Sequence, residues 1–310
     1  MGDRYLLDPF MNDLKDASGV LHELLCSVKA DDTLDLQIRD NAINVYYRGS
    51  SLVKVEPRLR GGYWFDFNTN YMRGGTPRAK PELIADVAAC KSWLDGVPTR
   101  KNAIDIYGAG REREIQQVLV RENNYGRGSV PKATDYFVID VEYAKKDHGR
   151  ADVVAVCVPS TSSDRKVADS DEKAKKRRLA IIELKFGDAA VSGGSGLLEH
   201  VKQAGLLAKN GTREPFCDEM LGIYHQKLTL KLLGEAPEQL VVDKSVLDFI
   251  IVIANHDPAK SALKRELAAI IGNYPANLTL WVASASQFGY GLFCDDQHMI
   301  PIEDFYKSLP

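Results

Sequence analysis

Residues 179–186 read LAIIELKF, an apolar stretch that carries two charged residues. Four apolar residues precede Glu183, and an apolar residue separates Glu183 from Lys185. Such a run is typical of a strand buried on both faces. Alternate residues of a strand share a face, so the side chains of Glu183 and Lys185 are expected to project together. Charged groups in so apolar a strand need a charged partner or a metal ion, because burying an unpaired charge is costly.

A second apolar run precedes this strand and begins with an acid. Asp152 opens the stretch VVAVCV, which predicts a strand over residues 152–158. Two carboxylates that lie close together repel each other, and a divalent cation removes that repulsion. Mg²⁺ prefers oxygen ligands, polarises a bound phosphate and lowers the pKa of a bound water. A neighbouring lysine positions that water or stabilises negative charge on the phosphate.

Outward from these two strands, the pattern predicts alternating helices and strands. Before them we expect a helix over 111–124 and a strand over 136–144, and after them a helix over 196–209. The remaining expected elements are a helix over 216–233, a strand over 249–254, a helix over 260–271, and strands over 278–283 and 289–293. This order predicts an α/β fold with a mixed central sheet flanked by helices.

The first hundred residues have a different pattern. Apolar residues at three- and four-residue steps predict helices within residues 5–30, with a break near Gly19. Short β-rich runs over 33–70 predict an antiparallel meander, and a connector with a short helix over 83–94 follows. We therefore expect a β-rich N-terminal region with leading helices over 1–100, and the α/β domain over 101–310.

Aromatic residues gather in the expected meander, together with several arginines. They could form a base-stacking platform or fill the core of the sheet, and the core is the favoured interpretation because aromatic residues prefer strands. The aromatic residues are Tyr46, Tyr47, Tyr63, Trp64, Phe65 and Phe67.

Composition excludes several classes of protein. The hydrophobic fraction is 45% and the net charge is −3, which predicts a globular chain without a basic coat over its whole surface. The longest apolar runs have six residues, so we expect no membrane partner and a cytoplasmic protein. The sequence has no Walker-type phosphate loop and no CxxC pair. The six histidines lack metal-ligand spacing and are expected to be structural or exposed.

Asp152, followed by Glu183 and Lys185 in a hydrophobic strand, resembles the PD-(D/E)XK superfamily of restriction-endonuclease-like nucleases. The order of helices and strands over 111–255 is similar too, and the chain looks like a bacterial family with this core. The resemblance implies that Asp152, Glu183 and the backbone carbonyl of Leu184 bind Mg²⁺ or Mn²⁺. It implies that Lys185 is the catalytic lysine.

The resemblance also implies further residues. Members of the superfamily often place another acid on the first helix, and Glu114 is the expected residue, with Glu122 as an alternative. Some branches carry a glutamine on the helix after the ExK strand, and Gln203 stands there. Ser195 and Lys202 are the other residues expected to contact nucleic acid.

Four further features leave alternatives open. The loop 187–196 is either a phosphate-binding loop, with Ser195 assisting, or a flexible turn. His200 on the following helix is expected to face nucleic acid or solvent, with Lys202 and Gln203. The polar stretch 165–178, with seven basic and three acidic residues, is either a phosphate contact or a solvated loop. Asp140 and Glu142 either join the metal cluster or, as we favour, face solvent or pair structurally.

The expected function is that of a hydrolase: metal-dependent cleavage of phosphodiester bonds in nucleic acid, with DNA as the expected substrate. The alternative is a nuclease-like module that binds nucleic acid or a protein partner without cutting.

Overall fold

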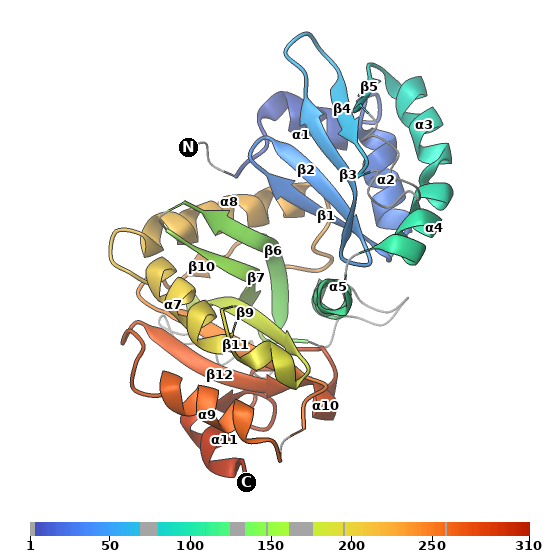
Figure 1. Cartoon of the computed structure of the whole chain (residues 1–310). Coiled ribbons are helices and arrows are strands. Elements are labelled where there is room, and N and C mark those ends of the chain that lie inside the picture. Colours follow the sequence, from blue (N-terminus) through green and yellow to red (C-terminus); the bar gives the residue numbers. More distant parts are fainter. Residues whose placement is uncertain are drawn as a thin grey trace. The chain divides into compact units, whose positions relative to one another are not determined.

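A computed structural model (Figure 1) describes residues 4–68, 80–108, 110–124, 134–146, 148–160, 176–194, 196–257 and 259–310. The chain forms two compact units. The first unit contains Met1–Arg121 and Gly222–Leu233, and the second contains Glu122–Leu221 and Gly234–Pro310. The boundary expected from the sequence, after residue 100, falls inside a helix of the first unit, α4 (Val97–Tyr107).

A five-stranded antiparallel sheet forms the centre of the first unit. Its strands follow one another in chain order, which confirms the expected meander and adds a fifth strand. The elements of this part are α1 (Asp8–Lys15), α2 (His22–Ala30), β1 (Leu34–Arg39), β2 (Ala42–Tyr47), β3 (Ser50–Pro57), β4 (Tyr63–Asp66) and β5 (Glu82–Ile84). Two helices at 8–30, with a break between them, confirm the expected leading helices.

The helix expected over 83–94 begins later than the apolar pattern suggests. Residues Glu82–Ile84 instead pair with β4 as strand β5. The helix α3 (Val87–Asp95) begins after Asp86, whose side chain accepts a hydrogen bond from the backbone N–H of Ala89 at 2.8 Å. This side-chain cap fixes the start of the helix, so the expectation for its first residues was wrong.

Most of the aromatic residues of the meander fill its core. Tyr46, Tyr63, Phe65 and Phe67 are buried, whereas Trp64 is exposed. Phe65 makes an edge-to-face contact with Trp93 of α3 at 5.0 Å between ring centroids. The core interpretation of these aromatic residues is therefore confirmed for four of the six.

A six-stranded mixed sheet forms the centre of the second unit, in the order β13-β12-β11-β9-β7-β6. Neighbouring strands β6, β7 and β9 are antiparallel, β9, β11 and β12 are parallel, and β13 is antiparallel to β12. The strands are β6 (Tyr136–Lys145), β7 (Gly149–Cys157), β9 (Leu179–Phe186), β11 (Leu247–Ala254), β12 (Leu278–Ser284) and β13 (Ile300–Pro301). A separate parallel pair joins β8 (Lys176–Arg177) to β10 (Val241–Val242).

Helices cover both faces of this sheet, so the expected α/β class with a mixed sheet flanked by helices is confirmed. On one face, Tyr143 of β6 contacts Phe216 and Glu219 of α8. On the other face lie α7 and α9, which contact each other and are nearer the viewer in Figure 1. The helices and short helical turns are α5 (Arg111–Asn124), η2 (Asp188–Val191), α7 (Leu197–Leu207), α8 (Arg213–Thr229), α9 (Ser261–Ile270), α10 (Ala285–Phe288) and α11 (Ile302–Ser308). The domain boundary crosses α5 and α8.

The strand expected over 289–293 is wrong. Backbone groups of this segment bond to a side chain and not to a neighbouring strand. The side-chain amide of Asn123 donates to the carbonyl of Tyr290 at 2.8 Å and accepts from the N–H of Leu292 at 2.9 Å. The last strand of the sheet is β13 instead. Among the described residues, no helix has both the length and the apolar character needed to cross a membrane.

Candidate metal centre

The register of the sheet brings the two predicted carboxylates together. In the antiparallel ladder between β7 and β9, Val153 pairs with Ile182. The next position of that ladder therefore sets Asp152 beside Glu183. Because residues of an antiparallel pair that stand opposite each other share a face, both carboxyl groups project from the same side of the sheet.

Glu183 lies at the centre of the cluster. Its side chain is only 2% exposed, and its carboxylate contacts Lys185 Nζ at 2.6 Å and His200 Nδ1 at 2.6 Å through different oxygens. Lys185 follows Glu183 by two residues in β9, so strand alternation places it on the same face, as expected. Leu184, between them, is fully buried on the other face. Both oxygens of Glu183 thus have cationic or hydrogen-bonding neighbours.

Asp152 adds a second carboxylate to the cluster, and the single positive charge of Lys185 can neutralise only one of the two. Burial and the negative charge of Glu183 raise the pKa of Asp152 to about 7, while His200 and Lys185 act in the opposite direction. The ionised form of Asp152 is therefore disfavoured in this environment. A divalent cation would remove this penalty by supplying positive charge between the two carboxylates.

The donor atoms present suit such a cation. Asp152, Glu183 and His200 each offer one ligand atom, and these atoms lie within 4.8 Å of one another. Two carboxylate oxygens match the preference of Mg²⁺ and Mn²⁺, and an imidazole nitrogen favours a first-row transition metal. The residues at this site therefore fit the metal that the sequence pattern implies.

His200 is the member of the cluster that sequence reasoning missed. We expected it to face nucleic acid or solvent, but it lies buried against Glu183. The physical reason is its position on the helix: it belongs to the buried stripe of α7, formed by Leu197, His200, Val201, Ala204, Gly205 and Leu207. This stripe has helical spacing, and it was the signal in the sequence that could have placed the imidazole toward the sheet.

The other predicted residues of α7 and its neighbouring loop have different surroundings. Gln203 is partly buried and donates a hydrogen bond to Glu199 Oε1 at 2.8 Å. Lys202 is exposed, and Ser195 lies outside the described residues. In the loop 187–196, Asp188 contacts Lys260 Nζ at 2.6 Å. The alternatives of phosphate loop and flexible turn stay predictions.

The acids predicted on the first helix lie in different units. Glu114 belongs to the first unit, where its carboxylate contacts Arg48 Nη2 at 2.7 Å. Glu122 belongs to the second unit and lies outside the donor group formed by Asp152, Glu183 and His200 among the described residues.

Asp140 does not face solvent, so the solvent half of that expectation is wrong for this residue, and its structural pairing stays a prediction. It is fully buried, and it pairs with Val154 across the ladder between β6 and β7. A bulge between Val138 and Asp140 shifts the register of β6 and turns this carboxylate inward. Glu142, with φ of 51°, is exposed as expected. Most of the polar stretch 165–178 lies outside the described residues.

The chain matches no family model, no curated protein and no solved structure. Any functional assignment therefore depends on the residues of the site and their arrangement.

Proposed function

We propose that this protein is a metal-dependent nuclease that hydrolyses phosphodiester bonds, with DNA as its substrate. The observation that carries the proposal is the buried cluster of Asp152, Glu183, Lys185 and His200, next to the last residue pair of the ladder between β7 and β9. A cluster of two acids, a lysine and a histidine is costly to bury. Such clusters are typical of sites that bind a ligand or catalyse a reaction.

The arrangement of the second unit supports the same proposal. After the last residues of α5, three antiparallel strands, a helix and a parallel strand follow in order as β6, β7, β9, α7 and β11, with α8 between α7 and β11. This order resembles the restriction-endonuclease-like core. In that comparison the second strand carries the aspartate and the third carries the glutamate and the lysine, as Asp152, Glu183 and Lys185 do here.

Asp152, Glu183 and His200 would hold Mg²⁺ or Mn²⁺, with the backbone carbonyl of Leu184 as a further ligand. A bound cation of this kind polarises a phosphate and lowers the pKa of a water molecule. Because imidazole nitrogen suits transition metals, we expect Mn²⁺ to bind more tightly than Mg²⁺. His200 also fixes the position of the Glu183 carboxylate through its contact at 2.6 Å.

Lys185 is the residue for which the proposal predicts direct contact with the reacting groups. Its side chain is 3% exposed and its ammonium group contacts Glu183 at 2.6 Å, so the ammonium group keeps a fixed position away from bulk water. In this position it would orient the attacking water and stabilise the negative charge that develops on the phosphate. On α7, Lys202 and Gln203 are the proposed contacts to the nucleic-acid backbone, together with Ser195.

One observation favours the alternative of a binding module that does not cut. Glu183 already has Lys185 on one oxygen and His200 on the other. The cluster could therefore be largely neutral without a cation when His200 is protonated. In that case the protein would bind nucleic acid or a protein partner with an affinity that does not depend on metal.

A cleavage assay with metal binding measured in parallel separates these functions. Purified protein is mixed with labelled single- and double-stranded DNA and RNA in Mg²⁺, Mn²⁺ or EDTA, and Mn²⁺ binding is measured by calorimetry. We expect cleavage of DNA that requires metal and falls at least about a hundredfold in Lys185→Ala and Asp152→Ala. Asp152→Ala should also lose Mn²⁺ binding.

The matched controls are Lys307→Ala and Asp304→Ala, which remove charges of the same sign from an exposed pair on α11. Both controls should cleave as the unmodified protein does. A folded protein that neither cuts any substrate nor binds Mn²⁺ would overturn the proposal in favour of the binding module.

A further inference from the structure

A cavity of about 280 Å³ lies in the second unit, on the face of the sheet opposite the candidate metal centre. Strand alternation establishes the face: Asp248 in its wall pairs with Ala180, whose side chain points away from the side that carries Glu183. The cavity is also at the other end of the strands, because Asp248 is near the start of β11 and Arg178 directly precedes β9. We call it the Asp248 cavity.

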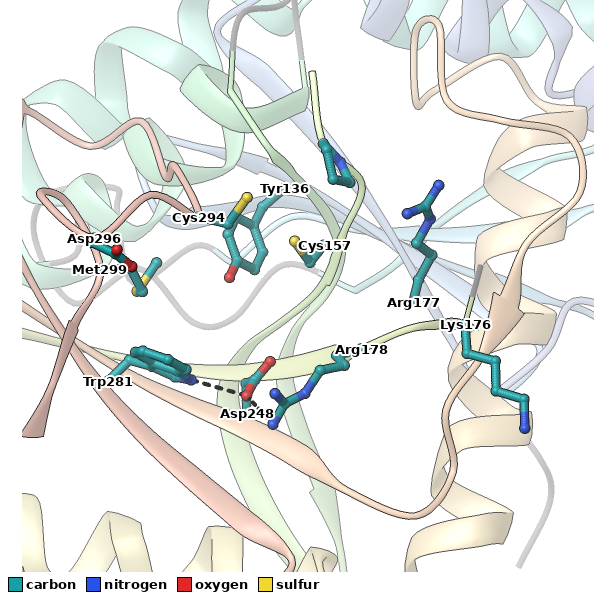
Figure 2. A pocket seen from close by; sticks show the side chains of 11 residues that line it. Tyr136, Cys157, Lys176, Arg177, Arg178, Asp248, Trp281, Cys294, Asp296 and Met299 are labelled. Atoms are coloured by element: carbon teal, nitrogen blue, oxygen red, sulfur yellow. Dashed lines mark hydrogen bonds and ion pairs between the residues drawn. The ribbon is translucent and has the colours of Figure 1, made fainter. Parts of the chain in front are cut away.

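Three side chains from neighbouring strands form its lower edge in Figure 2. Asp248 is buried, and its Oδ1 accepts a hydrogen bond from Trp281 Nε1 at 3.0 Å and contacts Arg178 Nη2 at 2.6 Å. Arg178 also donates to Thr279 Oγ1 at 2.7 Å. These contacts hold the indole, the carboxylate and the guanidinium in fixed positions relative to one another.

The upper edge of the Asp248 cavity is lined by aromatic and sulfur-containing side chains. Tyr136 and Cys157, a cross-strand pair of β6 and β7, lie there beside Cys294, and Met299 lies to the side near Trp281 (Figure 2). Asp135 fixes this wall: its carboxylate accepts the backbone N–H of Cys294 at 3.0 Å. The cavity therefore combines an aromatic and sulfur-lined space with a polar edge, as ligand pockets in proteins do.

The polar edge has unused hydrogen-bonding capacity. The Nε–H of Arg178 is buried and has no hydrogen-bond partner among the described residues. A buried donor of this kind needs an oxygen atom from water or a ligand. Arg177 and Lys176 also line the cavity, but their charged ends point away from Asp248 in Figure 2, so within the described part of the chain the unpaired Nε–H of Arg178 is the basic group that faces a ligand at this edge. An anionic ligand is therefore favoured over a cationic one.

We propose that the Asp248 cavity binds a nucleoside monophosphate. A planar base fits beside the Trp281 indole, where stacking is favourable whatever the base. An N–H group on the edge of that base suits the Asp248 carboxylate, and the phosphate suits the guanidinium group of Arg178. The volume is near the lower limit for ligand pockets, roughly 300 Å³, which favours one nucleotide over a dinucleotide.

This inference does not depend on the proposed nuclease activity, because the two sites lie on opposite faces of the sheet. Binding is therefore measured in EDTA, where the candidate metal centre is inactive. The probes are AMP, GMP, CMP and UMP, with adenosine and inorganic phosphate as partial ligands. Calorimetry and quenching of tryptophan fluorescence follow the titrations.

We expect at least one monophosphate to bind saturably and to quench fluorescence, with adenosine and inorganic phosphate each at least about tenfold weaker. Trp281→Phe should remove the quenching, and Arg178→Gln should weaken the monophosphate about tenfold and adenosine by less. Lys307→Gln, on exposed α11, is the matched control and should bind as the unmodified protein does.

Three outcomes would overturn the proposal. One is that no monophosphate binds to the folded protein at millimolar concentration. A second is that binding is unaffected by both Trp281→Phe and Arg178→Gln, which would place the nucleotide elsewhere. Equal affinity for inorganic phosphate and AMP would also contradict it, because the base would then contribute nothing.

Discussion

Each unit of this protein buries a lysine, and the two lysines have different partners. In the first unit, Lys227 is 2% exposed, and its ammonium group donates to Gln37 Oε1 at 2.8 Å. The amide of Gln37 in turn donates to both oxygens of Asp35 at 2.8 Å. This chain joins one positive and one negative charge through a neutral amide, so its charges balance.

In the second unit, Lys185 is buried to the same degree but faces an excess of acid. Glu183 contacts it directly, and Asp152 brings a second carboxylate to the same side of the sheet. Burial of a lysine therefore does not by itself mark a functional site. What distinguishes the second cluster is unbalanced negative charge together with donor atoms close enough for one cation.

The largest effect that would test this comparison is on stability in the first unit. Lys227→Met leaves the buried Oε1 of Gln37 without the charged donor that contacts it at 2.8 Å, so we expect the free energy of unfolding to fall by about 3 kcal/mol. Urea denaturation followed by tryptophan fluorescence measures this, because Trp64 and Trp93 both belong to the first unit. Lys29→Met, at an exposed position of α2, is the control and should change little. A loss below 1 kcal/mol for Lys227→Met would show that the chain of contacts is not a structural element.

The sequence alone predicted the cluster around Lys185 in part, but not the contacts of Lys227. Apolar runs located β9 and its neighbours, and strand alternation placed Glu183 and Lys185 on one face. The pairing of Asp152 with Glu183 depends on the register between β7 and β9. The long polar stretch between these strands contains no pattern from which that register could be predicted. Lys227 and Gln37 are 190 residues apart, and no local pattern joins them. His200 was missed because one polar residue on an apolar helical stripe resembles an ordinary structural histidine.

A smaller effect is expected from Asp152→Asn, in the protein freed of metal by EDTA. The folded pKa of Asp152, about 7, lies above its ordinary value of 3.8, so between these pH values the folded state binds more protons than the unfolded state. The free energy of unfolding therefore falls as pH rises through this window, and the asparagine variant escapes that fall. At pH 8 we expect the variant to be more stable than the unmodified protein by on the order of 2 kcal/mol, with little difference near pH 4.

Thermal denaturation over a series of pH values measures this difference, with Asp304→Asn on exposed α11 as the control. Addition of Mn²⁺ should then stabilise the unmodified protein and leave Asp152→Asn unchanged. A stability difference that does not vary with pH would mean that Asp152 is not held in its neutral form. The cluster would then resemble the balanced one around Lys227, and the comparison would fail.

The smallest effect is expected from a substitution of Glu114. This effect tests whether Glu114 belongs only to a surface ion pair of the first unit or also to the metal site. Its carboxylate pairs with Arg48, which also contacts Asp105 at 2.9 Å, and these side chains are each a third or more exposed. Exposed pairs contribute little, so Glu114→Gln should lower the free energy of unfolding by less than about 1 kcal/mol. If Glu114 belongs to this surface pair alone, calorimetry should give an Mn²⁺ affinity within about twofold of the unmodified protein. A tenfold weaker affinity would instead make Glu114 part of the metal site, as the sequence pattern implied. The excess of acid around Lys185 would then be larger, and the contrast with Lys227 sharper, than the second unit alone indicates.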